Sequence, residues 1–378
     1  MNRIYLDNAA TTALRPEVIE EITNSMKNTI GNPSSVHKFG REAKSAIELA
    51  RKNIAKHFKV TAAEIYFTSG GSEANNLVLW NAVANLDVKR IITSKIEHHA
   101  VLHKILDLKR TFNFELVFID LDEHGSVDYH QLELLLKESI DKTLVSLMYV
   151  NNEIGNILDI KTVGSLCHQY KALFHSDTVQ GVGHFIIDLQ QTPIDFITAS
   201  AHKFNGPKGV GFLYAKKGFA LKPLLIGGEQ EKGLRAGTEN VHSIVGMDKA
   251  LSIALLQLET EKTYITALKT YFINELTKIP GIAFNGLSDD LSKSSYTILN
   301  VRFPIETDLF VFNLDLKGVA VSGGSACQSG AQKGSHVLGA ILPENERNKA
   351  SVRFSFSYQN TKEEITTVIK LLKSMLLL

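Results

Sequence analysis

Short apolar segments alternate with amphipathic ones along most of this chain, and this alternation limits the possible fold more than any other feature. Segments 90–93 and 143–150 are apolar, whereas 38–58 and 160–170 place apolar side chains at helical spacing. Strands that alternate with helices are typical of a mainly parallel sheet covered by helices. The sequence therefore predicts an α/β fold.

The same criteria predict the other elements, and glycine, proline and polar turns mark most of their ends. We expect strands at the start of 5–12 and at 64–68, 90–93, 116–119, 143–150, 171–175, 193–199, 210–215, 296–302, 319–322 and 351–357. We expect helices at 16–28, 38–58, 69–83, 97–109, 128–137, 160–170, 241–277, 307–316 and 362–378, and one that begins at 335.

The bulk composition describes a globular protein without a strong charge preference. At 378 residues the chain exceeds one ordinary hydrophobic core, so two domains are expected. The net charge of +1 gives no reason to expect nucleic acid or a membrane surface as a partner. No apolar run reaches the roughly 18–20 residues of a membrane span, and the first residues lack signal-peptide features. Two cysteines are too few for a disulfide framework, so a reducing, cytoplasmic setting is expected.

Polar residues follow several predicted strands, at the carboxyl ends where open α/β sheets bind ligands. They are Ser72, His98, Asn152, Asp177, Gln180 and the run 200–203. The turn 69–76 places glycine and serine at a helix N-terminus, which binds phosphate through free N–H groups. An ordinary turn capped by Ser72 is the alternative. No lysine follows these glycines, so a cofactor phosphate is favoured over a nucleotide triphosphate.

Lys203 lies between two predicted core strands, 193–199 and 210–215. An amine on such a tight loop can be desolvated, which favours its nucleophilic, unprotonated form. Enzymes use such amines to form a Schiff base, most often with the aldehyde of pyridoxal phosphate. Ser200 and His202 beside it are suited to donate hydrogen bonds to a phosphate. The alternative is an exposed turn lysine.

The remaining candidates each have an ordinary alternative. Cys167 lies within a predicted helix and is interpreted as core packing, whereas Cys327 lies in a glycine- and serine-rich loop and is interpreted as a reactive thiol. Asp177 is suited to pair with a protonated pyridine nitrogen, or else it caps a turn. Arg353 is suited to bind a substrate carboxylate, or else it forms a surface ion pair. His98 alone indicates only a histidine at a helix N-terminus.

Taken together, these motifs resemble those of the pyridoxal-phosphate-dependent cysteine desulfurases of the NifS/IscS type, in the class V aminotransferase group. The resemblance covers nearly the whole chain, and the Ser-Ala-Cys loop separates desulfurases from ordinary aminotransferases. The motifs lie at 5–12, 68–76, 97–102, 151–155, 175–181, 200–203, 235–240, 324–327 and 352–355.

The resemblance implies the fold of the type I pyridoxal-phosphate-dependent transferases, with a seven-stranded, mainly parallel sheet in a large domain and a smaller α+β domain. It implies that the large, cofactor-binding domain spans 15–255. The small domain, with the cysteine loop, would comprise 1–14 and 256–378.

The resemblance also implies the role of each site residue. The catalytic residues are Lys203, which forms the Schiff base and shuttles protons, Cys327, which takes the sulfur as a persulfide, and His98, which stacks on the cofactor ring. The other cofactor-binding residues are Asp177 at the pyridine nitrogen, Asn152 and Gln180 near the phenolic oxygen, and Gly71, Ser72, Ser200 and His202 at the phosphate. Thr238 would reach the cofactor phosphate of the other subunit. The substrate carboxylate would be held by Arg353, Asn152 and Asn32.

The implied reaction converts L-cysteine to L-alanine in a homodimer. The sulfur would pass to an iron–sulfur scaffold or another acceptor protein, for iron–sulfur cluster assembly, tRNA thiolation or both. The loop with Cys327 resembles the longer, mobile type that delivers sulfur directly, but 328–336 departs from it in detail, which leaves the acceptor open. No metal site is expected, and contact of Cys327 with an acceptor's iron–sulfur cluster is left open.

Three alternatives remain from the sequence. A selenocysteine lyase shares the same motifs. A true aminotransferase has no use for Cys327. A sulfur-relay subunit with weak catalysis would not require both Lys203 and Cys327 to be intact.

Overall fold

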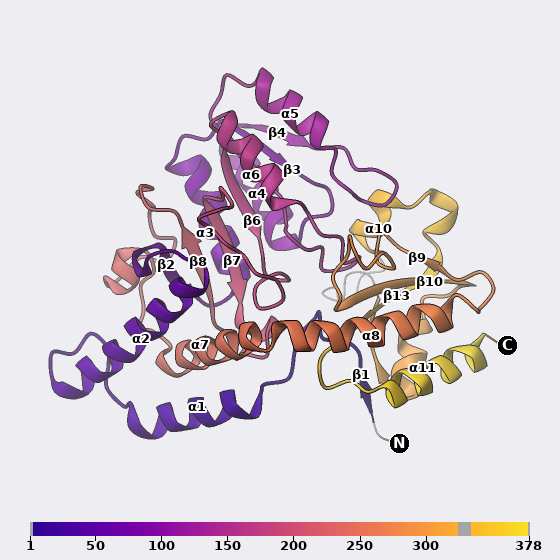
Figure 1. Ribbon diagram of the computed structural model, residues 1–378. Coiled ribbons are helices and arrows are strands. Elements are labelled where there is room, and N and C mark those ends of the chain that lie inside the picture. The colour runs from indigo at the N-terminus through magenta and orange to yellow at the C-terminus, as the bar shows by residue number, and fades with distance from the viewer. Residues whose placement is uncertain (1–2, 324–333, 377–378) are drawn as a thin grey trace.

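A central sheet of seven strands organises the computed structural model, which describes residues 3–323 and 334–376 (Figure 1). Its strands are β2 (Ile65–Thr68), β3 (Arg90–Thr93), β4 (Glu115–Phe118), β5 (Thr143–Ser146), β6 (Leu173–Asp177), β7 (Phe196–Ser200) and β8 (Gly211–Ala215). Their order is β2-β8-β7-β6-β5-β3-β4. β8 is antiparallel to both of its neighbours, and all other neighbours are parallel. The predicted mainly parallel α/β fold is confirmed.

Helices cover both faces of this sheet, which explains why its strands read as continuous apolar runs. Adjacent strand residues such as Ile91 and Ile92 point into different hydrophobic clusters. One cluster contains α3 (Gly71–Ala84) and α4 (His99–Thr111). The other contains α2 (Lys38–His57), α5 (Tyr129–Glu138), α6 (Ile160–Gln169) and α7 (Val241–Leu256), and α1 (Pro16–Asn28) packs on α7. Cys167 is buried in this second cluster, as predicted.

A smaller sheet has its own core and its own helices. Its strands β9 (Ala283–Phe284), β10 (Ile298–Glu306), β12 (Ser322–Gly323) and β13 (Lys349–Ser355) are antiparallel in the order β12-β13-β10-β9. Beside them, β1 (Ile4–Tyr5) pairs in parallel with β11 (Val319–Ala320). The helices of this part are α8 (Leu258–Leu276), α9 (Phe310–Leu316), α10 (His336–Ile341) and α11 (Lys362–Met375). Short 3₁₀ turns η1 to η4 lie at Ala62–Glu64, Ala201–Lys203, Gln230–Gly233 and Glu344–Glu346.

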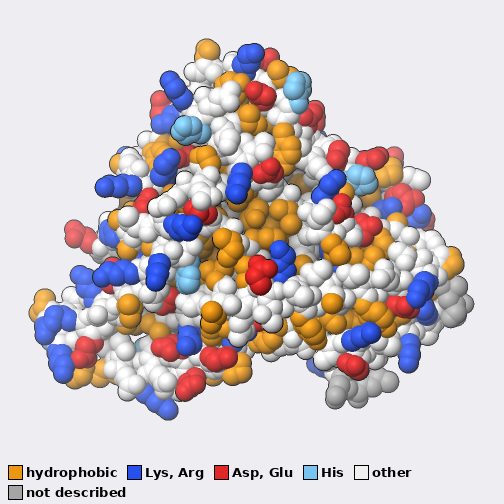
Figure 2. All heavy atoms as spheres, in the orientation of Figure 1, with side chains coloured by type: hydrophobic (Ala, Val, Ile, Leu, Met, Phe, Trp, Pro, Cys, Tyr) orange, Lys and Arg blue, Asp and Glu red, His pale blue; other side chains and the backbone are white. Residues whose placement is uncertain are grey.

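The hydrophobic clusters bear on the predicted division into two domains. The cluster of the small sheet joins Ile4 and Leu6 to residues from Ile265 onward, whereas the largest cluster runs from Val18 to Ala254. This distribution supports a division at 14/15 and 255/256, which stays a prediction. A small fourth cluster packs α10 against Ile96 and Ile154 of the large part. Figure 2 shows cationic and anionic side chains interspersed over one face, in keeping with the net charge of +1.

Some predicted bounds were wrong. The helix expected at 241–277 is two helices, α7 and α8, which meet at Gln257 with a bend of 70°. The bend lets α7 pack in one core and α8 in the other. The strand expected at 143–150 ends at Ser146, and the two-residue β9 was not predicted. Within the described part of the chain, only the bent α7–α8 pair, and no single helix, has the length and apolar character of a membrane span.

Candidate active site

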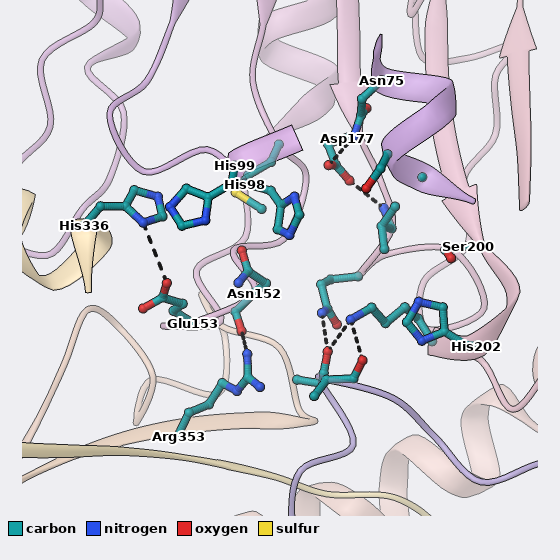
Figure 3. A pocket seen from close by; sticks show the side chains of 18 residues that line it. Asn75, His98, His99, Asn152, Glu153, Asp177, Ser200, His202, His336 and Arg353 are labelled. Carbon is teal, nitrogen blue, oxygen red and sulfur yellow. Dashed lines mark hydrogen bonds and ion pairs between the residues drawn. The ribbon is translucent and has the colours of Figure 1, made fainter. Parts of the chain in front are cut away.

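A pocket of about 320 Å³ lies where the carboxyl ends of the parallel strands meet the small sheet (Figure 3). Elements of both sheets contribute to its wall, with Asp177 at the end of β6 and Arg353 on β13. The predicted site residues that line it are Gly71, Ser72, His98, Asn152, Asp177, Gln180, Ser200, His202, Lys203 and Arg353.

Lys203 reaches the pocket from the 3₁₀ turn that joins β7 to β8, as predicted. Its Nζ donates to the carbonyl oxygens of Ala9 at 2.6 Å and Ala10 at 2.9 Å. The turn is fixed by Asn205, whose φ of 63° lies in the left-handed region and whose side chain donates to the carbonyl of Ala13 at 2.8 Å. The N-terminal segment therefore holds the amine at the pocket wall.

Asp177 ends β6 as a buried carboxylate. One oxygen accepts from the backbone N–H of Val179 at 3.0 Å, and the other accepts from Nδ2 of Asn75 at 2.7 Å. Among the described residues, no ion pair involves Asp177. Two donors stabilise the charged form of a carboxylate, and a positively charged ligand atom would complete its partners.

The N-terminus of α3 forms another part of the wall. Gly70 has φ of 151°, which favours glycine, and a Cβ on Gly71 would lie only 2.4 Å from Cγ2 of Val179, so a side chain at Gly71 would force a shift. His202 also lines the pocket, and its Nδ1 is 3.2 Å from Oγ1 of Thr11. Burial, with the charge of Lys203, lowers the pKa of His202 to about 4, so the ring is neutral at neutral pH.

His98 caps α4, and its Nδ1 accepts from the backbone N–H of Ala100 at 3.1 Å. The proton of the neutral ring is therefore on Nε2. Burial lowers the pKa of His98, although Asp177 opposes this. Beyond it, the ring of His99 lies 4.6 Å from that of His103 and 4.4 Å from that of His336. Burial also lowers the pKa of His99 to about 4.

Arg353 closes the pocket from β13. Its guanidinium donates to the carbonyl of Asn152 at 2.7 Å and to Oδ1 of Asp7 at 2.9 Å. The arginine is buried, and its Nε has no hydrogen-bond partner among the described atoms. The ion pair that was the alternative for Arg353 therefore exists, but it lies inside the pocket wall and not on the surface. Gln180 is held by the same N-terminal segment as Lys203, because its Nε2 also donates to the carbonyl of Ala9, at 2.8 Å.

Three predicted site residues are not brought into the pocket. Asn32 and Thr238 are exposed and do not line it. Cys327 lies outside the described residues.

Other lining residues were missed from the sequence, among them Ala9, Asn75, His99, Glu153 and His336. Ala9 acts through its backbone, which no side-chain pattern indicates. Asn75 lies inside the motif 68–76, and its position one helical turn after Gly71 was the available signal.

Comparisons with known proteins identify the family of the chain. Residues 4–368 match the family model described as aminotransferase class-V. A relative described as putative cysteine desulfurase IscS 1, from Bacillus subtilis (strain 168), is 42% identical over 98% of this chain and 97% of its own length. The solved structure of a NifS-like protein has a TM-score of 0.91 with 34% identity, covering 99% of both chains. A structure described as SspA in complex with cysteine has a TM-score of 0.80 with 30% identity, covering 95% of this chain and 100% of its own.

The fold and the family match thus define a member of the class V aminotransferase family. The chain belongs to that family and, within it, to the cysteine desulfurases of the NifS/IscS type.

Proposed function

We propose that this protein is a pyridoxal-phosphate-dependent cysteine desulfurase, which converts L-cysteine to L-alanine and passes the sulfur on as a persulfide of Cys327. The observation that carries the proposal is the convergence of Lys203, Asp177 and Arg353 in one pocket. An amine, a buried carboxylate and a buried guanidinium are the groups needed for an aldehyde, a pyridine nitrogen and an amino-acid carboxylate.

The donor set of the pocket fits pyridoxal phosphate. Asp177 has two donors and no paired cation among the described residues, so it suits a protonated pyridine nitrogen. The N-terminus of α3 with Gly71 and Ser72, together with Ser200 and His202, suits the phosphate. When bound, the cofactor supplies the aldehyde for Lys203 and an electron sink that weakens bonds near the substrate α-carbon.

The chain's own residues supply binding and proton transfer. We expect Arg353 to bind the substrate carboxylate together with Asn152, because both residues line the pocket. Lys203 Nζ moves the proton at the substrate α-carbon. His98 lines the pocket, and its Nε2, which carries the proton of the neutral ring, would serve as a second proton donor or acceptor there.

The sulfur is transferred in a single nucleophilic displacement. The thiolate of Cys327 attacks the substrate sulfur, an S–S bond forms, and the C–S bond breaks. The electron pair of the broken bond stays with the carbon fragment, which takes up a proton and becomes L-alanine. One cysteine and one thiol thus become one alanine and one persulfide, which an iron–sulfur scaffold or another acceptor protein then consumes.

A homodimer in a reducing cytoplasm is part of the proposal. Thr238 is exposed on the loop before α7, where a second subunit can receive it. Large apolar side chains nearby are also exposed, with Val36 and Ile226 both at 88%. Such exposure of apolar residues is typical of a surface that a partner covers.

The test is a mass spectrum of the protein after incubation with L-cysteine, together with assays of sulfide and alanine. We expect one added sulfur on the peptide that contains Cys327, and none after Cys327→Ala. Cys167→Ala is the matched control and should keep the added sulfur, because Cys167 is buried in the core. Lys203→Ala should lose the visible absorption of the bound cofactor.

Full sulfide release by the Cys327→Ala variant would contradict the persulfide route. Turnover of selenocysteine without any turnover of cysteine would instead identify a selenocysteine lyase.

A further inference from the structure

A buried chain of hydrogen bonds leads from the pocket carboxylate into the sheet. Oδ2 of Asp177 accepts from Nδ2 of Asn75 at 2.7 Å, and Oδ1 of Asn75 lies 3.0 Å from Nε2 of His175. Nδ1 of His175 lies 2.9 Å from Oγ of Ser146 on the neighbouring strand. Asn75 and Ser146 are 1% exposed, and His175 is 0% exposed, so water does not substitute for these partners.

The negative charge of Asp177 determines which atoms carry the protons along this series of hydrogen bonds. A carboxylate can only accept, so Asn75 must turn its amide N–H toward Asp177 and its carbonyl oxygen toward His175. His175 must then carry its proton on Nε2, which leaves Nδ1 to accept from the hydroxyl of Ser146. Thr198, whose Oγ1 donates to Oδ1 of Asn75 at 2.9 Å, does not set this order, because a hydroxyl can donate or accept.

Reversing the direction of these hydrogen bonds would change the protonation of Asp177. With its proton on Nδ1, His175 would present a lone pair to Asn75, and the amide would flip. Its carbonyl oxygen would then face Asp177, and that contact is favourable only when the carboxyl group is protonated. A protonated carboxyl cannot hold a positively charged pyridine nitrogen. The tautomer of His175 and the ionisation of Asp177 are therefore linked.

We propose that His175 is a positioning residue: through Asn75, its Nε2–H holds Asp177 as a carboxylate aimed at the cofactor's pyridine nitrogen. This rests on the proposed function, since it assigns that nitrogen to Asp177. Burial lowers the pKa of His175 to about 3, so the ring stays neutral and keeps one tautomer across the physiological range. His175 precedes Asp177 by two positions on β6, so both side chains point to the same face.

Two substitutions of His175, whose side-chain amides extend to different distances toward Asn75, test this role. In His175→Gln, the side-chain amide reaches as far as Nε2 and restores a donor to Asn75. In His175→Asn, it replaces only Nδ1 and leaves Asn75 without that donor. We expect His175→Asn to weaken cofactor binding to the apoprotein about tenfold or more, and His175→Gln to stay within about threefold of the wild type. The pH at which the visible band of the bound cofactor changes should shift only in His175→Asn, and a purely structural residue would not separate the two variants in this way.

A measurement on the unmodified protein covers the case in which the variants do not fold. Nitrogen-15 histidine spectra of the apoprotein, with the His175 ring assigned through its own backbone resonances, should show the Nε2–H tautomer. A Nδ1–H tautomer, an imidazolium at neutral pH, or equal cofactor affinity and band titration in both folded variants would overturn the inference. If the wild type binds no pyridoxal phosphate, the proposed function fails instead, while the tautomer still reports on the hydrogen-bond chain.

Discussion

Glu97 is a buried acid whose protonation affects the stability of the fold. It is 1% exposed, and its Oε1 accepts from Oγ of Ser94 at 2.8 Å and the N–H of Met148 at 3.1 Å. Its Oε2 has no partner among the described atoms. Burial raises its pKa from 4.5 to about 8, so the folded protein keeps a proton that the unfolded chain releases.

From this follows a pH dependence. The contribution of Glu97 is fully present below the unfolded pKa of 4.5 and is lost as the pH rises through about 8. Glu97→Gln keeps the shape of the side chain but removes the ionisable group. The free energy of unfolding of this variant should therefore rise relative to that of the wild type as the pH rises. Denaturant unfolding at about pH 5 and about pH 9 measures this difference.

Glu20→Gln is the control, because Glu20 is exposed on α1 and no ion pair among the described residues involves it. A difference between Glu97→Gln and the wild type that stays constant with pH would show that Glu97 is ionised in the folded protein.

At the scale of elements, the start of α3 depends on the absence of a side chain. A Cβ at Gly71 would lie 2.4 Å from Cγ2 of Val179, which follows β6. Gly71→Ala should therefore displace α3 or Val179 and weaken cofactor binding about tenfold. Val179→Ala in the same chain removes the clash and should restore most of the affinity, with a coupling of about 1 kcal/mol or more.

Titration of the apoprotein with pyridoxal phosphate measures this effect in all four proteins of the cycle. If the second substitution brings no recovery, the contact between Gly71 and Val179 is not what places the helix.

The sequence predicted elements best where one periodic pattern met clear turn residues. The helix at 16–28 matches α1, and the strand at 90–93 matches β3. The break at Gln257 was missed because no glycine or proline marks it, and only packing in two cores requires it. The site residues at strand ends were predictable because parallel strands bring their carboxyl ends together. Asn75 and His175 were missed, since their roles depend on contacts between distant segments.

At the scale of the whole molecule, the exposed apolar residues around Ile226 test the homodimer. We expect Ile226→Asp to shift the protein toward monomer and to weaken cofactor binding, because Thr238 would no longer reach the other subunit's cofactor. Sedimentation velocity at several concentrations measures the first effect, and titration with pyridoxal phosphate measures the second.

Ile140→Asp is the matched control, because Ile140 is also exposed but lies in the turn before β5 and not in the loop that carries Ile226 and Thr238. A wild-type protein that sediments as a monomer, or a dimer that survives Ile226→Asp unchanged, would count against the predicted interface.

The pairing of β1 with β11 has a consequence for biosynthesis. Ile4 is aligned with Val319, so the first strand has no partner until the ribosome has made almost the entire chain. The carbonyls that anchor Lys203 follow directly after that strand, at Ala9 and Ala10. A nascent chain can thus build its large sheet early, but β1, which leads into the segment that holds Lys203, finds its partner strand only near the end of translation. A product truncated before β11 would keep Ala9, Ala10 and Lys203 but lack the strand that pairs with β1.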